Sequence, residues 1–514
     1  MGKGQKASKR WYQRRWVWVL IFIALIVLIR LTVLAPREVD IIIGHDTTRI
    51  TGPVNPDGTV NYVAYLNEHY SRGVTKDNNA AVPLIQALGA EGFFLSESQD
   101  MAFEMLGMST PIGPDEHFVP LARHASSNPA SEGVAAGGAA GMEKQLNKAS
   151  RAPWSADEYP VLAAWLKANE SHLRLMVSAS RRTHYYLPMV SPGRFAAVPE
   201  AMIRPSIGRL LEACASLSAR AMLKAGGGQM EDAWQDILAL HRLGRLIGRG
   251  ATLIECMLGA RFVDSASCCA EVLATSDALS SGQVRKHLAD LQALEPIPTL
   301  VQVADLGERM TSLDAVMVMK RAAGPGVDWN DVLVKLNRHW DDHVAALTAP
   351  TYLDRTRAFD VLDARTRSMS EDIKESGHLK LLLFHLVGDP AQKARNGIAT
   401  KGILCLTNVS HNSMSAGLHA AVMRFELSKV SMALAAFRAE NGAYPTKLAE
   451  LNLKAIPRDV FSASGGPLVY RAVAGGYVLY SVGMNGIDDG GARSDKNDEG
   501  DIVVRAGKAP AAGR

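Results

Sequence analysis

The chain has 514 residues, of which 47% are hydrophobic and 21% charged. This composition supports an ordinary globular core and excludes a chain that is disordered throughout. The formal net charge is +4, but six basic residues fall within positions 1–15, where there is no acid. The remainder therefore carries a small net negative charge, which gives no reason to expect nucleic-acid binding.

Residues 16–35 predict a transmembrane helix that follows a basic cytoplasmic segment, residues 1–15. The stretch is apolar except for Arg30 and Thr32, and about twenty residues are needed to cross a bilayer as a helix. The preceding basic residues and nearby tryptophans predict a single-pass anchor in the inner membrane, with the N-terminus cytoplasmic and the bulk of the chain periplasmic. A cleaved signal peptide is the alternative, because a basic leader and an apolar run fit both.

Residues 36–77 predict a short β-hairpin with a linker. Residues 40–70 alternate β-branched with polar side chains, and the turn sequence Asn55-Pro56-Asp57-Gly58 divides them, which is typical of a hairpin leading into a short helix. An isolated hairpin is barely stable in water, so we expect this one to pack against a neighbouring element.

Residues 78–412 predict a large all-α domain built of helical hairpins. Within residues 231–249, five positions spaced by three and four residues share one helix face: Ala233, Ile237, Leu240, Gly244 and Ile247. Three consecutive glycines at 226–228 join this helix to another at 210–224, as in an αα-hairpin. Further helical patterns cover residues 155–180, 252–275, 281–294, 301–322, 329–346 and 354–376.

Residues 125–153 interrupt this domain with a stretch rich in glycine, alanine and serine. We expect a flexible loop there, because few of its side chains are bulky and apolar. The five cysteines are odd in number and show no C-x-x-C spacing. They are therefore expected to be small buried groups and not a disulfide framework or a structural zinc site.

Two polar motifs of the helical region are candidate sites. His339 and His343 lie four residues apart, as zinc ligands on one helix face do, and Asp342 is a candidate base in an order loosely similar to H-x-x-E-H. The other interpretation is two exposed histidines on a polar helix. Residues 181–186 (RRTHYY) fit either an anion or sugar site that uses charge and stacking, or a loop with two anchoring tyrosines.

Residues 413–505 predict an α+β domain. A helix over residues 413–441 ends at Asn441-Gly442, a usual C-cap, and Pro445 prevents its continuation. Residues 468–473 and 477–482 follow as two strands joined by a glycine-containing turn. Residues 506–514 are expected to form a disordered tail.

An acidic loop over residues 488–501 follows these strands. Calcium takes six to eight oxygen ligands, and the four glycines at 486, 490, 491 and 500 let backbone carbonyls turn inward beside the carboxylates. The standard EF-hand is excluded, because its twelfth position would be Ala506 and not Glu. On composition alone, a calcium loop and a solvated loop of repelling acids remain equally good interpretations.

Two motifs of this region, Gly442-x-Tyr444-Pro445 and S-x-G-x-N-G-x-D-D-G-G at residues 481–491, carry a family resemblance. About eighty residues resemble the globular domain of the major pseudopilin of type II secretion. The resemblance implies bound Ca²⁺, with backbone oxygens near Ser481 and Val482. The candidate side-chain ligands that it implies are Asp488, Asp495, Asp498 and Asp501.

The resemblance does not extend to the start of the chain. No prepilin-type leader is present, and nearly 380 residues separate the predicted anchor from the matching helix, so we do not expect polymerisation as a pilus subunit. The whole arrangement also resembles a group of uncharacterised bacterial membrane-anchored envelope proteins, which implies no activity.

The sequence therefore predicts a mainly α, membrane-anchored extracytoplasmic protein that binds or scaffolds a protein or cell-wall partner and ends in a calcium-stabilised module. No G-x-S-x-G, P-loop or G-x-G-x-x-G motif is present. The alternative is a metal-dependent hydrolase of cell-envelope material that uses His339 and His343, with Asp342 as base.

Overall fold

The structure is a computed structural model, and it describes residues 39–109, 117–127, 138–191, 198, 206–322, 326–375, 389–407, 411–451, 453, 455–492 and 500–507. These residues form two compact units. Unit 1 comprises residues up to 60 together with 312–340 and 363–408, and unit 2 comprises residues 61–311, 341–362 and 409–514. The predicted transmembrane helix at 16–35 lies outside the described residues. No helix among those that are described is both long and apolar enough to cross a membrane.

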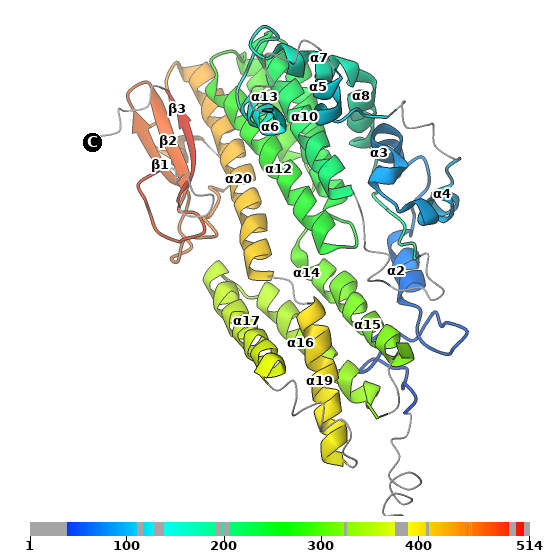
Figure 1. Cartoon of the computed structure of the whole chain (residues 1–514). Helices are drawn as coiled ribbons and strands as arrows, with labels where there is room; N and C mark the ends of the chain where they lie inside the picture. The colour runs from blue at the N-terminus through cyan, green and yellow to red at the C-terminus, as the bar shows by residue number, and fades with distance from the viewer. Residues whose placement is uncertain are drawn as a thin grey trace, which may run out of the picture. The chain divides into compact units, whose positions relative to one another are not determined.

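The described chain is mainly helical, with one small antiparallel sheet near the C-terminus (Figure 1). The helices are α2 (Tyr62–Tyr70), α3 (Ala81–Leu88), α4 (Gln99–Leu106), α5 (Leu121–Ser126), α6 (Gly138–Ala149), α7 (Pro160–Ala168), α8 (Glu170–Ala179), α10 (Ser206–Gly226), α11 (Met230–Ile247), α12 (Leu253–Thr275), α13 (Ser281–Gln292), α14 (Leu300–Gln302), a π-helical segment (Val303–Glu308), α15 (Arg309–Ala322), α16 (Trp329–Leu347), α17 (Tyr352–Glu375), α19 (Asp389–Thr407) and α20 (His411–Asn441). The strands are β1 (Val469–Val473), β2 (Gly476–Ser481) and β3 (Ile502–Ala506).

Helices α11 and α12 form the centre of unit 2 and cross at very short range. All five residues of the predicted α11 face are buried. A Cβ atom added to Gly244 of α11 would lie 2.7 Å from the carbonyl oxygen of Gly259 on α12. The two backbones approach so closely only because both positions lack a side chain. The predicted αα-hairpin of α10 and α11 is confirmed, and both helices contribute to the same core.

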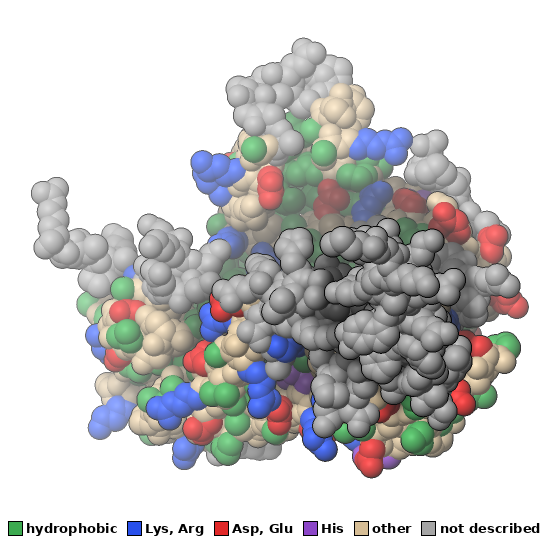
Figure 2. Space-filling model, turned by 60° about the horizontal axis from the view of Figure 1, so that its bottom comes forward, with side chains coloured by type: hydrophobic (Ala, Val, Ile, Leu, Met, Phe, Trp, Pro, Cys, Tyr) green, Lys and Arg blue, Asp and Glu red, His purple; other side chains and the backbone are tan. Residues whose placement is uncertain are grey.

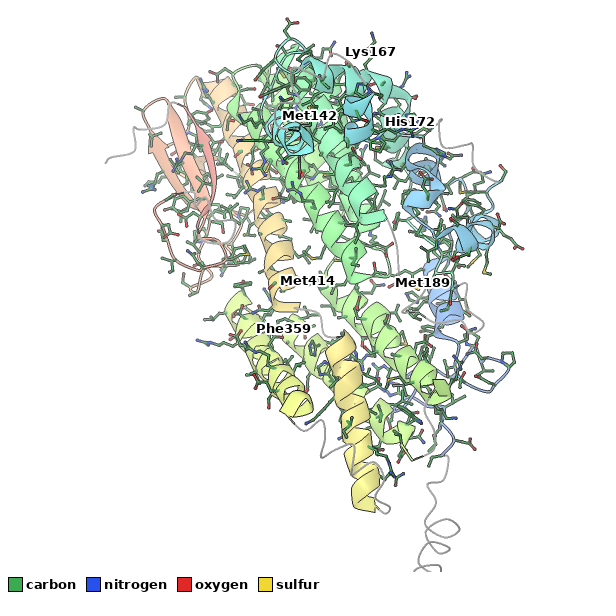
Figure 3. The ribbon with its side chains drawn as sticks, viewed as in Figure 1. Met142, Lys167, His172, Met189, Phe359 and Met414 are labelled. Atoms are coloured by element: carbon green, nitrogen blue, oxygen red, sulfur yellow. The ribbon has the colours of Figure 1, made fainter. Side chains whose placement is uncertain are left out.

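The predicted loop over residues 125–153 is wrong for its second half. Residues 138–149 form helix α6, and Met142 and Leu146 are buried in the same core as residues of α10 (Figure 3). The chain after α6 is tied to α10 as well, because Trp154 Nε1 donates to the carbonyl oxygen of Ala219 at 2.9 Å. Together with Ala149, these apolar side chains hold the alanine-rich helix on its neighbour.

The predicted hairpin in residues 36–77 is much shorter than expected. In the described residues 39–60, the β pairing is a single bridge between Val54 and Val60, which flanks the predicted turn. The preceding backbone is bound by side chains of α16 in unit 1: Asn330 Nδ2 donates to the carbonyl oxygen of Asp40 at 2.9 Å, and Asn337 Nδ2 to that of Thr47 at 2.7 Å. These side chains satisfy carbonyl groups that a partner strand would otherwise bind.

Helix α20 is buried on two faces within unit 2. One face contributes Phe425, Met432 and Ala436 to the core that contains α11 and α12. Another face contributes Met423, Leu427, Val430 and Leu434 to a second core beneath the three-stranded sheet. In Figure 1 the helix accordingly lies between the sheet and α12. The predicted arrangement of one long helix and a small sheet is therefore observed.

The sheet has the order β1-β2-β3, with both pairs antiparallel. Every residue of the central strand β2 is buried. The Gly-x-Tyr-Pro motif joins the end of α20 to this sheet: the Tyr444 ring lies edge-on against Tyr477 at 4.9 Å, and the Tyr470 hydroxyl donates to the carbonyl oxygen of Pro445 at 2.6 Å. Gly442 has φ 78°, a left-handed conformation that glycine adopts without strain at a helix C-terminus.

Candidate functional site

The acidic loop closes on the carboxylate of Asp501, which is 6% exposed. Its Oδ2 accepts a hydrogen bond from the backbone N–H of Gly491 at 2.6 Å, and its Oδ1 accepts from the backbone N–H of Asp489 at 3.3 Å. The left-handed glycines 490 and 491 allow the backbone to turn toward the carboxylate. Asp501 thus connects the two ends of the acidic loop.

Asp488 and Asp489 belong to the same loop. Asp488 Oδ1 accepts from the Tyr480 hydroxyl at 2.8 Å, and Asp489 Oδ2 accepts from Asn485 Nδ2 at 3.0 Å. Burial raises the pKa of Asp501, and the negative charges of Asp489 and Asp488 raise it further, whereas the two backbone hydrogen bonds lower it. The Asp501 carboxylate is therefore a group whose charge a bound cation would stabilise.

The other two predicted calcium ligands, Asp495 and Asp498, lie outside the described residues. Among the residues that the structure does describe, no group of three His, Cys, Asp or Glu side chains is placed to hold a metal ion. The set of four aspartate ligands therefore stays a prediction. Two of its members, Asp488 and Asp501, lie within one loop of the described residues.

Asp459 is a buried structural residue at this end of the sheet that the sequence analysis missed. It is 1% exposed and accepts from the Ser481 hydroxyl and the Val482 backbone N–H, both at 2.8 Å. It also accepts from the Phe461 N–H at 3.0 Å. Asp459 thereby fixes the point where β2 leads into the acidic loop, and an isolated Asp between Arg458 and Val460 carries no motif that would have revealed this role.

The two histidines of the hydrolase hypothesis lie on helix α16, with His339 in unit 1 and His343 in unit 2. His339 is partly buried, with its ring centroid 6.0 Å from that of Trp340. His343 is 2% exposed, and its ring centroid lies 6.1 Å from that of Phe359 on α17; Figure 3 labels Phe359. The interpretation of two exposed histidines is therefore wrong for His343, which packs in a core, while Asp342 is exposed.

The tyrosines of residues 181–186 anchor their segment in the core, as one of the two interpretations predicts. Tyr185 and Tyr186 are 6% and 5% exposed. The Tyr186 hydroxyl donates to Asn67 Oδ1 at 3.0 Å, and its backbone N–H donates to Asn79 Oδ1 at 2.9 Å. With both rings buried, this motif offers no stacking surface to a ligand.

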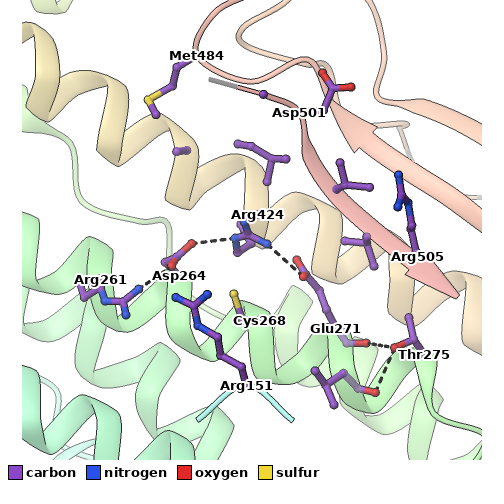
Figure 4. A pocket seen from close by; sticks show the side chains of 16 residues that line it. Arg151, Arg261, Asp264, Cys268, Glu271, Thr275, Arg424, Met484, Asp501 and Arg505 are labelled. Atoms are coloured by element: carbon purple, nitrogen blue, oxygen red, sulfur yellow. Dashed lines mark hydrogen bonds and ion pairs between the residues drawn. The ribbon is translucent and has the colours of Figure 1, made fainter. Parts of the chain in front are cut away.

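A cavity of about 670 Å³ in unit 2 was not predicted from the sequence (Figure 4). Helix α12 forms one wall, through residues spaced three or four apart on one face: Arg261, Asp264, Cys268, Glu271 and Thr275. The other walls come from α20, from β3 with the residues just before it, and from Arg151 after α6. This volume lies within the range of small-molecule sites.

Charged side chains alternate along the floor of this cavity. Arg261 Nη1 lies 3.0 Å from Asp264 Oδ2, and Asp264 Oδ1 in turn accepts from Arg424 Nε at 2.9 Å. Arg424 Nη1 lies 3.3 Å from Glu271 Oε2. Burial disfavours the charge of Arg424, but the neighbouring acidic groups outweigh it and raise its pKa above the usual value.

Three described cysteines, Cys214, Cys256 and Cys269, are buried and free, as the sequence predicts, whereas Cys268 is partly exposed and lines the cavity. Burial raises the pKa of the Cys268 thiol to about 12, although Arg424 and Arg151 lower it. The thiol is therefore protonated at neutral pH and lacks the thiolate character of a nucleophilic cysteine.

Comparisons of the chain with protein-family models, with curated proteins and with solved structures found no match.

Proposed function

We propose that this chain is a binding or scaffolding protein held at the cytoplasmic membrane by residues 16–35, with its bulk on the extracytoplasmic side. In this proposal the C-terminal module, residues 413–505, is stabilised by Ca²⁺. The partner is a protein or a component of the cell wall. The single observation that carries the calcium proposal is the closure of the acidic loop on the buried Asp501 carboxylate, which accepts from backbone N–H groups of the loop and is near enough to Asp488 and Asp489 for their charges to raise its pKa.

The architecture of the module supports the proposal. A long helix packed against a three-stranded antiparallel sheet, followed by an acidic loop that closes into β3, is the arrangement that the pseudopilin resemblance implies. The Gly-x-Tyr-Pro motif also has a structural role here, because it joins α20 to β1 and β2. The motif that carries the resemblance is therefore part of the packing of the module.

Electrostatics support a cation in preference to an empty loop. Burial raises the pKa of Asp501, and the negative charges of the exposed Asp489 and Asp488 raise it further, so a counter-charge would favour its ionised form. A divalent cation of flexible coordination, bound by carboxylate and backbone oxygens, removes this repulsion. Calcium bound only by the native state then adds stability by mass action, about 2.7 kcal/mol at a hundred times its Kd.

The test uses the detergent-solubilised full chain, because α20 is also buried against the helices of unit 2 and the isolated module would expose that face. Hydrogen exchange measured by mass spectrometry reports on residues 485–492 and 500–507 separately from the rest of the chain. Removing calcium with a chelator should accelerate exchange in these two segments, and adding calcium back should slow it, whereas magnesium at the same concentration should not.

Asp501→Asn is the informative variant, and Asp157→Asn, an exposed acid outside the module, is its matched control. We expect the calcium-dependent difference in exchange to disappear in D501N and to persist in D157N. Only this difference is compared, because D501N also loses a backbone hydrogen bond and is destabilised with or without calcium. Equal exchange of the wild-type loop in chelator and in calcium would rule the proposal out.

A further inference from the structure

The described residues that line the cavity between α12, α20 and β3 carry more positive than negative charge. Its lining includes four arginines, Arg151, Arg261, Arg424 and Arg505, and three acids, Asp264, Glu271 and Asp501. Arg261 and Arg424 are paired with Asp264 and Glu271 along α12. The carboxylate of Asp501 is bound by backbone N–H groups of the acidic loop, and Figure 4 shows it pointing away from the α12 side chains.

Among the described residues, Arg151 is therefore a cation without a counter-charge in this cavity, whereas Arg505, like Asp501, points away from the α12 side chains in Figure 4. Among the described residues, neither Arg151 nor Arg505 has an acidic oxygen within 4.0 Å. Arg505 donates to the carbonyl oxygen of Gly491, a neutral acceptor. The Arg151 guanidinium lies beside Asp264 and Cys268 in Figure 4 and has no dashed contact there. An arginine remains charged at any pH of interest, so this excess is permanent.

The thiol in the cavity does not supply the missing negative charge. A thiolate at Cys268 would pair with Arg151 and Arg424, which both favour its charged form. Burial nevertheless raises the pKa of this thiol to about 12, so the group is neutral. On the face drawn in Figure 2, Lys/Arg and Asp/Glu side chains are interspersed, so that face is not generally basic.

Apolar side chains of α12, α20, β3 and the segment after β2 complete the lining. Val272, Ala420, Met484, Ile502 and Val504 contribute to the lining. A ligand that fits both the arginine side chains and the apolar side chains of this cavity has a compact anionic head and a short apolar body. Guanidinium groups bind carboxylate and phosphate oxygens through paired hydrogen bonds, which are stronger than those between neutral groups.

We propose that this cavity binds a small organic anion, whose carboxylate or phosphate head is held by Arg151 and whose apolar body lies against Val272, Met484 and Ile502. Arg261, with a side chain 45% exposed and one nitrogen engaged by Asp264, is the second donor to the head group. This site shares Gly500 and Asp501 with the acidic loop, but the residues that bind the anion lie outside that loop, and the proposal requires no membrane anchoring.

The test is isothermal titration calorimetry on the solubilised full chain in the presence of a chelator, with inorganic phosphate and hexanoate as the two probes. The titration is repeated with calcium in place of the chelator, because residues 500–505 line the cavity, and the two conditions together separate a missing anion site from a loop that needs calcium. Arg151→Gln is the informative variant, because the side chain is exposed and makes no ion pair among the described residues, so the fold is expected to persist. Arg181→Gln, an exposed arginine of the RRTHYY motif, is the matched control.

We expect at least one probe to bind, with an affinity that falls as salt is added. R151Q should weaken this binding roughly tenfold or more, as expected for the loss of hydrogen bonds to a charged group, and R181Q should leave it unchanged. Tighter binding of phosphate assigns a phosphate head to the natural ligand, and tighter binding of hexanoate assigns a carboxylate with an apolar body. Binding of neither probe, or equal binding by R151Q and the wild type, would overturn the proposal.

Cys268 provides a second readout that locates the ligand. A small neutral thiol reagent should modify it slowly, because its thiol is largely protonated. The bound probe should slow this modification further, by a factor that depends on Arg151, as peptide mass spectrometry can measure. Unchanged modification of Cys268 at saturating probe would place the anion elsewhere and would refute the assignment to this cavity.

Discussion

Arg424 of helix α20 donates from Nε to Oδ1 of Asp264 on helix α12 across 2.9 Å, and this contact joins residues 160 positions apart in the chain. Both side chains are less than one-third exposed, and Asp264 also binds Arg261. The pair attaches the C-terminal module to the helices of unit 2 and forms the floor of the arginine-lined cavity. Stability and ligand binding therefore share one structural element.

Asp264→Asn should destabilise the protein by about 2 kcal/mol, because it leaves the partly buried Arg424 with Glu271 as its remaining acidic partner. The midpoint of urea unfolding, followed by circular dichroism, measures the effect. Asp277→Asn is the matched control: Asp277 binds Arg438, also on α20, but is 74% exposed. The control should change stability by less than about 1 kcal/mol. Equal effects of the two variants would contradict the role assigned to Asp264.

Gly259→Ala should be strongly destabilising, by about 3 kcal/mol or more, because the new methyl group would collide with the backbone of α11 at Gly244 and Gly248. Thermal unfolding of the solubilised chain measures the loss. Gly282→Ala introduces the same group on α13, where a Cβ atom meets nothing within 4 Å. That control should be neutral or stabilising by up to about 1 kcal/mol, because alanine favours the helix. A tolerated G259A would show that α11 and α12 do not cross as closely as described.

Stability should fall as the pH drops below about 6.5, in part because of His241. This residue is fully buried, and neither of its ring nitrogens has a hydrogen-bond partner among the described residues. Burial lowers the pKa of His241 well below its usual value, and the charge of Arg245 lowers it further. The unfolded chain takes up a proton near pH 6.5 that the folded chain does not. The stabilising contribution is thus complete above that pH and is lost as the pH falls.

His241→Leu removes this proton uptake and should flatten the dependence of the unfolding midpoint on pH between about 5 and 7. The variant should also be more stable at pH 8, by about 1 kcal/mol, because two unsatisfied buried nitrogens are removed. The comparison requires urea unfolding of both proteins across the pH range. Parallel pH profiles for the wild type and H241L would show that other groups account for the acid sensitivity.

Local patterns in the sequence predicted most helices and the C-terminal hairpin. Helix α12 was predicted to within one residue at its start, where Thr252 and Glu255 form a capping box. The β1–β2 hairpin was predicted from its glycine-containing turn, and Gly475 has φ 71°. These features depend on residues within one or two turns of each other, so the sequence pattern contains the physical cause.

Features that depend on distant partners were not predicted. Helix α6 forms in an alanine- and glycine-rich stretch because α10 covers two of its side chains. Residues 40–47 do not pair as strands because Asn330 and Asn337, nearly 290 positions away, bind their backbone. The predicted helix over residues 155–180 is divided at Asn169, which is buried and accepts from the Val119 N–H at 2.7 Å. In each case a tertiary contact prevailed over local preference.

From its own order of residues, the chain determined where most of its helices lie, which of their faces are apolar, and that acids gather after the last hairpin. It contained no sign that Arg151, Arg261, Arg424 and Arg505 share a cavity, because these residues belong to four separate segments. Only the packing of α12, α20 and β3 brings their charges together. The physical reason is that backbone preference acts over a few residues, whereas electrostatic interactions depend on distance in space.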